Sequence, residues 1–457
     1  MRTPLLAVVL LASLLAACAT ATEDRQPVEA APTTAAPTPA PSPPTTAAPT
    51  TTAPQQLMAP GCRPWDDGPV APESAGLTAA LRGHLDDPRL AGARVGVSVW
   101  VEGWGEVLAH HADERLLPAS NQKLLTAAGV LEALPLATTL RTQVVATRAP
   151  DPATGVVDGD LVLVAGGDPT LSLDGDHSLA SLAAAVRDAG VTEVRGALVV
   201  DESRYGTARS APGWQDWHIP TYTGPLSPLV VDDNRGRADP AFLAEPALEH
   251  AEDLRDRLAA VGVAVAGPVR AGPAPAGATP VAGLDSAPLG ELLDRMLLRS
   301  DNEVAESLTR EAGALLTGDG STPGGTAALA EVLEGTCAPL DPGGWGDGSG
   351  MSRADQRSPR ELRRLLQHAR TRPWWDELRS RLPVAARSGT LSGRFHGTAA
   401  EGRVAAKTGT IIGGASLTGV VDTAGGRTAF FSVLVEGDGA APAMDALDEL
   451  LVTVAGS

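Results

Sequence analysis

The apolar residues of this 457-residue chain change their spacing along the sequence, and each change predicts a structural element. Residues 74–85 have helical spacing, whereas the apolar run at residues 95–101 predicts a buried strand, followed by a glycine turn and a return strand through residues 107–108. A strongly apolar helical stretch follows over residues 120–134. A strand pair followed by a buried helix predicts an α+β domain, in which a sheet is flanked by helices.

Strand and helix patterns alternate in the middle of the chain, over residues 141–284. We expect strands at residues 161–164, 196–200 and 263–265, and helices at residues 178–189 and 249–261. This order predicts an inserted α/β domain, which would divide the main domain into residues 61–140 and 285–457. Towards the end of the chain, residues 430–435 predict a core strand and residues 442–454 a closing amphipathic helix.

The first 60 residues lack the pattern of a folded domain. An apolar run that ends at Ala17 has the length of an export signal and is too short for a membrane span. Residues 15–18 resemble a bacterial lipobox, in which Cys18 becomes the lipidated first residue of the mature protein; an ordinary cleaved signal is the alternative. Residues 18–60 are rich in Pro, Thr and Ala and predict an extended tether. We therefore expect an exported, lipid-anchored protein that faces the cell wall.

Two further cysteines, Cys62 and Cys337, are expected in an oxidising compartment. A disulfide between them would tie the start of the folded region to a point well into the second half of the chain. Two unpaired thiols are the alternative, because the sequence does not show whether the two Cα atoms are close enough.

The net charge of −19 restricts the partners of the protein. Nucleic acid, or an anionic membrane surface, would need a positive patch, and an aromatic content of 3% gives few platforms for stacked bases. We therefore expect no nucleic-acid partner, and membrane contact only through the N-terminal lipid. The eight histidines are scattered, with only His110 and His111 adjacent, so the sequence predicts neither a metal site nor a cofactor.

Lysine is nearly absent from the chain. Of the 36 Lys and Arg residues, only Lys123 and Lys407 are lysine. Arginine serves for surface charge but keeps its proton in proteins, whereas a desolvated lysine can act as a neutral base or present a compact charge. We therefore expect the two lysines where arginine could not perform the chemistry.

Three short motifs carry candidate catalytic side chains. Ser120 and Lys123 lie three residues apart at the start of the predicted helix 120–134, so they share one face and the lysine could take the serine proton. A serine-aspartate-asparagine triplet begins at Ser300, and a lysine-threonine-glycine triplet begins at Lys407 in a strand-like context. Each motif alone is a weak signal. Together, and in this order, they are the set of penicillin-binding proteins and class A β-lactamases.

The wider sequence resembles the D-alanyl-D-alanine carboxypeptidase/endopeptidase family of low-molecular-mass penicillin-binding proteins, class C. The resemblance covers nearly everything after Cys62. It is carried by residues 118–123 (PASNQK), 166–171 (GGDPTL), 200–203 (VDES), 211–214 (APGW), 300–302 (SDN), 347–353 (DGSGMSR) and 407–410 (KTGT). The resemblance implies the α/β (α+β) transpeptidase-like fold of serine β-lactamases and penicillin-binding proteins, with an antiparallel sheet flanked by helices.

The same resemblance implies the roles of the reacting groups. Ser120 would be the acylated nucleophile, Lys123 its general base, and Ser300 the proton relay towards the leaving amine. Backbone N–H groups of Ser120 and Thr410 would form the oxyanion hole, a geometry that suits a helix start facing an edge strand.

The resemblance also implies how substrate is held. Asn302 would hydrogen-bond the acyl-side amide, while Lys407, with Thr408, would face the terminal carboxylate of a peptidoglycan stem peptide. The peptide would lie along the Lys407 strand as an added strand. β-Lactams would be covalent inhibitors. Because Lys407 would only need to stay positive, we expect Lys407→Arg to be milder than Lys123→Arg.

Other functions stay open from the sequence alone. A slow β-lactamase would share the acylation step, but the Glu-x-x-x-Asn loop of class A enzymes is missing, since no asparagine lies between Asn302 and Lys407. A non-hydrolytic peptidoglycan-binding or β-lactam-sensing lipoprotein would need no nucleophile and base. The family often carries two nested inserts, yet the segment from Asn234 to Glu249 is short, so we expect one. The sequence does not separate carboxypeptidase from endopeptidase action.

Overall fold

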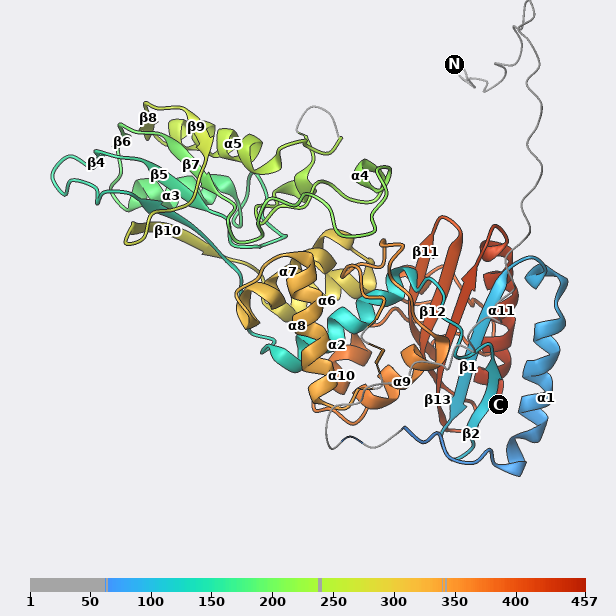
Figure 1. Ribbon diagram of the computed structural model, residues 1–457. Helices are drawn as coiled ribbons and strands as arrows, with labels where there is room; N and C mark the ends of the chain where they lie inside the picture. Colours follow the sequence, from blue (N-terminus) through green and yellow to red (C-terminus); the bar gives the residue numbers. More distant parts are fainter. Residues whose placement is uncertain (1–61, 63–64, 237–240, 339, 342) are drawn as a thin grey trace, which may run out of the picture. The chain divides into compact units, whose positions relative to one another are not determined.

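The computed structural model describes residue 62 and residues 65–457, apart from residues 237–240, 339 and 342 (Figure 1). Residues 1–60, which hold the expected export signal, Cys18 and the tether, lie outside the described residues. Within the part of the chain that is described, no helix is long and apolar enough to cross a membrane.

A five-stranded antiparallel sheet is the centre of the main domain. Its strands are β1 (Arg94–Val101), β2 (Gly105–His110), β11 (Val404–Ile411), β12 (Gly414–Asp422) and β13 (Thr428–Glu436). They lie in the order β11-β12-β13-β1-β2, so strands from opposite ends of the folded chain are neighbours. β1 pairs with β13, with Val97 opposite Val433. The strands expected at residues 95–101 and 430–435 are thus confirmed, as adjacent strands.

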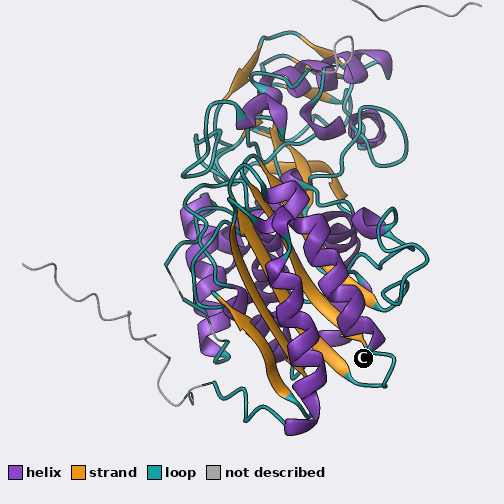
Figure 2. Ribbon diagram, turned by 90° about the vertical axis from the view of Figure 1, so that its right-hand side faces the viewer, coloured by secondary structure: helices purple, strands orange, loops and turns teal. Residues whose placement is uncertain are grey.

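Alternating side chains of this sheet pack against helices on both faces. On one face, which buries Phe431 and Val433, lie α1 (Ala75–Gly83) and α11 (Ala440–Gly456) (Figure 2). Phe430 and Leu434 point to the other face and pack against a second helical layer. That layer comprises α2 (Lys123–Ala133), α6 (Leu289–Leu298), α7 (Asn302–Leu316), α8 (Thr322–Gly335), α9 (Pro359–Ala369) and α10 (Trp375–Ser380).

The middle of the chain forms a second sheet, in the order β10-β3-β5-β7-β9, with a separate core. Its strands are β3 (Arg141–Ala146), β5 (Leu161–Val164), β7 (Leu198–Asp201), β9 (Val269–Ala271) and β10 (Thr279–Asp285). β5, β7 and β9 are parallel, as βαβ units require, whereas β3 is antiparallel to both of its neighbours. The region also contains a small parallel sheet of β4 (Val156–Val157), β6 (Glu193–Val194) and β8 (Ala264–Val265), and the helices α3 (Leu179–Asp188), α4 (His218–Thr221) and α5 (Pro246–Ala260).

The element boundaries in this region differ in part from those expected. α5 begins at Pro246 instead of residue 249, because proline is favoured in the first turn of a helix. The strand expected at residues 263–265 is reduced to the two residues of β8. α3 agrees with the sequence: it follows Ser178, whose side chain accepts a hydrogen bond from the Ser181 N–H.

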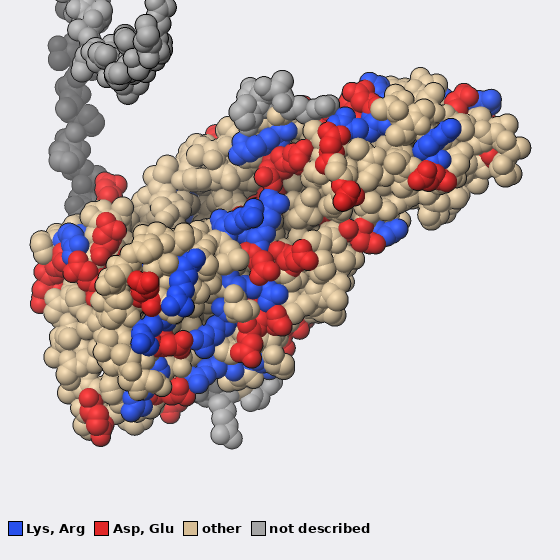
Figure 3. All heavy atoms as spheres, turned by 180° about the vertical axis from the view of Figure 1, so that it is seen from behind, with Lys and Arg blue, Asp and Glu red and all other residues tan. Residues whose placement is uncertain are grey.

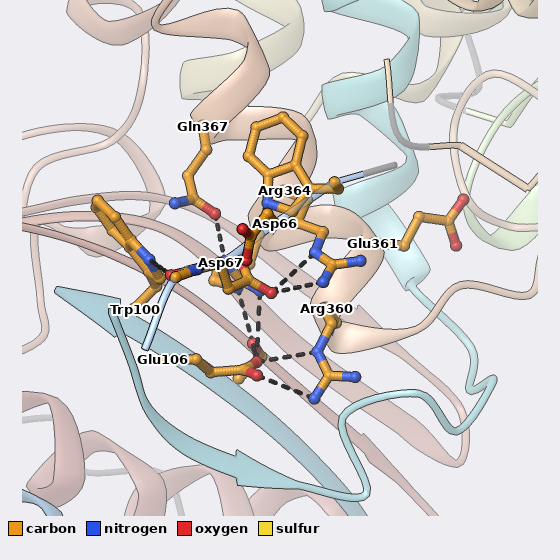
Figure 4. A network of polar contacts seen from close by, with 12 residues as sticks. Asp66, Asp67, Trp100, Glu106, Arg360, Glu361, Arg364 and Gln367 are labelled. Carbon is orange, nitrogen blue, oxygen red and sulfur yellow. Dashed lines mark hydrogen bonds and ion pairs between the residues drawn. The ribbon is translucent and has the colours of Figure 1, made fainter. Parts of the chain in front are cut away.

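A network of arginines holds the start of the folded chain against the main domain (Figure 4). The Asp67 carboxylate accepts hydrogen bonds from Arg363 Nη1 at 2.6 Å and from Arg364 Nη2 at 2.5 Å, both on α9. The Asp67 carbonyl accepts one from Trp100 Nε1 of β1 at 3.0 Å. Arg363 is fully buried and also donates to Ser98 Oγ at 2.8 Å. Because a buried guanidinium needs such partners, the network fixes this segment to α9 and β1.

A disulfide joins Cys62 to Cys337, with 5.5 Å between the two Cα atoms. The sequence had left this pairing open. The two cysteines are 275 positions apart, so the bond closes a very long loop and restricts the unfolded chain strongly.

Arginine and carboxylate side chains make up the charged surface. Both lysines are buried, so the basic side chains visible in Figure 3 are arginines, and acidic side chains are interleaved with them on that face. Many arginines form ion pairs: Arg394 pairs with Asp448, for example, and Arg372 with Glu132. Arginine thus serves as the general surface cation, as the composition indicates.

Candidate active site

The first motif begins in a tight turn that precedes α2. Residues Ala119–Gln122 form a 3₁₀ turn and α2 starts at Lys123, so the helix expected over residues 120–134 is present, with its first turn in the 3₁₀ form. A 3₁₀ turn has three residues per turn, which aligns residues three apart. Ser120 and Lys123 are aligned in this way: Lys123 Nζ donates to Ser120 Oγ at 3.0 Å. The amine and hydroxyl are therefore close enough for direct proton transfer.

The Lys123 side chain is completely buried and hydrogen-bonded to neutral oxygen atoms. Besides Ser120 Oγ, Nζ donates to Asn302 Oδ1 and to the Ser349 carbonyl, each at 2.7 Å. Burial lowers the pKa of Lys123 to about 8, and the charges of Asp347 and Glu306 oppose this shift. At pH 7 about a tenth of the molecules then hold the neutral amine that a general base requires.

The second motif connects α6 to α7. Ser300 has a left-handed backbone conformation, with φ of 59°, between the two helices. Asp301 caps α7 by accepting a hydrogen bond from the Val304 N–H, so the acid of the motif has a structural role. Asn302 accepts from Lys123 through Oδ1 and donates through Nδ2 to the Tyr222 carbonyl at 3.2 Å. Asn302 thereby links Lys123 to the segment that contains Tyr222.

The third motif lies on the edge strand β11. Lys407 is fully buried, and its Nζ donates to Ser300 Oγ and to the Thr408 carbonyl, each at 2.8 Å. Burial, and then the charge of Lys123, lower the pKa of Lys407 well below its usual value. A larger guanidinium would have to displace the neighbours of this enclosed position. That Lys407→Arg is milder than Lys123→Arg stays a prediction.

Thr408, Gly409 and Thr410 of β11 lie beside the 3₁₀ turn that contains Ser120. A Cβ atom at Gly409 would lie 2.9 Å from the Ser120 backbone nitrogen, so only glycine permits this approach. Thr408 Oγ1 shares a hydrogen bond with Thr390 Oγ1 at 2.6 Å, whereas Thr410 is exposed. β11 is the last strand of its sheet, and its outer edge pairs with Val384 at Ala405, so the part of this edge beyond Ala406 can pair with an added peptide.

Residues 347–353, to which the sequence analysis assigned no chemical role, form a loop that contacts Lys123. Asp347 accepts hydrogen bonds from the N–H groups of Ser349, Gly350 and Ser352 at 3.0, 2.6 and 2.8 Å. It also accepts from Trp214 Nε1 at 2.7 Å. The loop thus presents the Ser349 carbonyl to Lys123. An aspartate two residues before a serine and three before a glycine is typical of such self-bonded loops and was the available signal.

Two buried acids beneath this loop were missed by the sequence interpretation. Glu306 Oε1 accepts from the N–H groups of Gly348 and Ser349 at 3.1 and 2.9 Å, whereas Oε2 has no partner among the described residues. Burial, together with the charge of Asp347, raises the pKa of Glu306 to about 8 and that of Asp355 well above its usual value. These shifts favour the neutral form of both acids, which limits the negative potential around Lys123.

Comparison with known proteins identifies the family. The model of the D-Ala-D-Ala carboxypeptidase 3 (S13) family matches residues 77–241 and 239–454. The chain belongs to this S13 family. The matched residues include all three motifs, so the predicted family is confirmed.

Several relatives and solved structures agree with this membership. The D-alanyl-D-alanine carboxypeptidase of Actinomadura sp. (strain R39) is 33% identical over 456 residues, which is 81% of this chain and 84% of that protein. Carboxypeptidase DacB of Mycolicibacterium smegmatis is 32% identical and covers 86% and 87% of the two chains. Penicillin binding protein 4 (dacB) of Haemophilus influenzae has the same fold, with a TM-score of 0.74 at 21% identity over 83% of this chain and 99% of that one. The predicted fold class is thus confirmed for this S13 protein.

The pH dependence of acylation tests Lys123 as the base. Only neutral Lys123 can accept the Ser120 proton, so acylation by a β-lactam should rise about tenfold per pH unit below pH 8 and level off above it. Lys123→Arg should lower the acylation rate at least about 100-fold, because a guanidinium keeps its proton. Stopped-flow labelling between pH 6 and 9 measures both. Arg148→Lys, at an exposed site, is the control; a pH-independent rate would contradict the assignment.

Glu306 variants test whether the buried acid positions the base. Glu306→Ala leaves two buried N–H groups without their acceptor and should slow acylation about tenfold. It should also shift the pH profile of acylation to lower pH, because the negative charge of Glu306 raises the pKa of Lys123. Glu306→Gln keeps Oε1 and should retain most of the rate. A slower rate with an unchanged profile would indicate a structural effect only.

Proposed function

We propose that this S13 protein is a serine-type D-Ala-D-Ala carboxypeptidase that cleaves peptidoglycan stem peptides through an acyl-enzyme on Ser120. The hydrogen bond from the buried Lys123 amine to Ser120 Oγ supports this proposal most directly. The names of the relatives in Actinomadura and Mycolicibacterium, both carboxypeptidases, agree with it. A protein that only bound the peptide would gain nothing from a desolvated base beside a hydroxyl.

Acylation follows from the positions of the hydroxyl and amine groups. Ser120 Oγ attacks the carbonyl carbon of the penultimate D-Ala while Lys123 Nζ takes the hydroxyl proton. Backbone N–H groups of Ser120 and Thr410 would stabilise the oxyanion. Ser300 Oγ would pass a proton to the departing nitrogen as the amide bond breaks, and D-Ala leaves as the amine. Water then hydrolyses the ester on Ser120, with Lys123 again as the base.

The substrate would be held along β11. Lys407, with Thr408, would bind the terminal carboxylate, which would restore the positive charge that burial disfavours at Lys407. Asn302 would hydrogen-bond the acyl-side amide. The backbone of the peptide would pair with the free edge of β11 as an additional strand. A β-lactam would acylate the same serine. In this proposal, residues 141–284 form one inserted domain within the catalytic domain.

Ser120→Ala tests the proposed reaction. The variant should release no D-Ala from a pentapeptide that ends in D-Ala-D-Ala and should form no covalent adduct with fluorescent penicillin, because the nucleophile is absent. Ser203→Ala, at an exposed position, should retain both activities. Labelling of the wild type without D-Ala release would favour a penicillin-sensing protein, and rapid turnover of nitrocefin would favour a β-lactamase.

We further propose that the protein is exported and that Cys18 is its lipid attachment site. Residues 15–18 support this because of their likeness to a lipobox. Cys18→Ser should move the protein from the membrane fraction to the soluble fraction in cell fractionation, whereas Cys337→Ser should not. Membrane recovery of the Cys18→Ser variant would contradict lipid anchoring.

A further inference from the structure

The APGW motif, residues 211–214, belongs to the middle region of the chain (residues 141–284), yet it contacts the loop of residues 347–353. Gly213 has a left-handed backbone, with φ of 78°, and a Cβ atom there would lie 2.3 Å from Ser352 Oγ, so only glycine permits this approach. Three hydrogen bonds join the two segments: Ser352 Oγ to the Pro212 carbonyl at 2.7 Å, the Arg353 N–H to the Gly213 carbonyl at 3.2 Å, and Trp214 Nε1 to Asp347 Oδ2 at 2.7 Å.

A second contact from the middle region reaches Lys123 through Asn302. The Tyr222 carbonyl accepts a hydrogen bond from Asn302 Nδ2 at 3.2 Å, and Asn302 Oδ1 accepts one from Lys123 Nζ at 2.7 Å. Because the side-chain amide has its donors and its acceptor on opposite sides, engaging Nδ2 at Tyr222 turns Oδ1 towards the amine. Of the three oxygen atoms bonded to Lys123 Nζ, two are thus positioned from the middle region: Asn302 Oδ1, and the Ser349 carbonyl in the loop that Trp214 contacts.

Packed aromatic rings order the segment between these two contacts. His218 is fully buried, and the centroid of its ring lies 6.3 Å from that of Trp214, 4.1 Å from that of Trp217 and 6.0 Å from that of Tyr222. His218 Nδ1 also accepts a hydrogen bond from the Gln215 N–H at 3.0 Å. Because rings at these distances stabilise one another, the segment holds the Trp214 indole and the Tyr222 carbonyl in a fixed arrangement.

We propose that the middle region completes the general base of the enzyme, and that Trp214 is the positioning residue through which it does so. Trp214 Nε1 holds Asp347, Asp347 orders its loop through backbone N–H groups, and the loop presents the Ser349 carbonyl to Lys123. The middle region is then a working part of the acylation step and not a separate module. This inference rests on Lys123 as the base of the proposed reaction and adds a residue that acts on it.

The charged groups that act on Lys123 come from several elements. They are Asp301 and Glu306 at the start of and within α7, Asp347 and Asp355 between α8 and α9, and Lys407 of β11. Asp347 itself is faced by His218, whose pKa is lowered by burial and by the charge of Arg353. Within the described part of the chain, Asp347 is the one of the groups around Lys123 that accepts a hydrogen bond from the middle region. An N–H donor offsets part of the negative potential of a carboxylate, so the loss of the indole N–H would let Asp347 raise the pKa of Lys123 further.

The experiment measures the pH profile of acylation by a fluorescent penicillin with the full-length protein. Trp214→Phe keeps an aromatic ring but removes the N–H donor. The midpoint of its profile should move up by about half a pH unit, which lowers the rate at pH 7 about threefold, while the plateau at high pH stays within about twofold of the wild type. Trp217→Phe is the matched control: it lies in the same segment, its Nε1 has no hydrogen-bond partner among the described residues, and its profile should match that of the wild type.

A second pair of variants tests whether the effect passes through Asp347. In an Asp347→Asn background, Trp214→Phe should cause no further shift of the midpoint, because residue 347 then carries no charge for the indole to offset. A shift that persists in this background, or a lowered plateau with an unchanged midpoint in Trp214→Phe alone, would overturn the inference and leave the carboxypeptidase proposal standing. A wild type that neither releases D-Ala nor is acylated by penicillin would overturn both.

Discussion

The rest of the site depends on the burial of one amine without a carboxylate partner. Lys123 is fully enclosed, and its three hydrogen bonds go to neutral oxygen atoms, so its positive charge is not compensated by direct contact. Desolvation therefore weakens its hold on the proton, and this is the property that a base for serine needs. A carboxylate at any of those three positions would stabilise the ammonium and remove the base.

The acidic residues near Lys123 are arranged so that its pKa stays low. Asp347 is committed to backbone N–H groups and to Trp214, so it orders the loop that supplies the Ser349 carbonyl. Burial raises the pKa of both Glu306 and Asp355 and so favours their neutral forms, which reduces their negative potential at Lys123. Acidic residues near the base thus act chiefly as hydrogen-bonding groups.

The sequence singled out the motif residues and predicted the strand-like context of Lys407, because both leave local signals. The burial of Leu124 to Leu131 and the run of β13 follow from apolar spacing, and the lysine count singled out Lys123 and Lys407. The 3₁₀ turn at Ser120, the hydrogen bonds of Asp347 within its loop and the raised pKa of Glu306 were not predicted. The pKa of Glu306 depends on contacts between segments far apart in the chain, which no local pattern contains, whereas the loop of Asp347 has a local signal that was not used.

The disulfide separates the residues of the active site into two covalently different parts of the chain. The chain from Cys62 to Cys337 forms a covalent ring that includes Ser120, Lys123 and Ser300, whereas Lys407 and β11 belong to the open tail beyond it. When the chain emerges with its N-terminus first, the disulfide can close this ring before the residues after Cys337 have emerged. Ser120 and Lys123 then already lie within the ring, and the site is completed only when the tail inserts β13 beside β1 and brings Lys407 to Ser300.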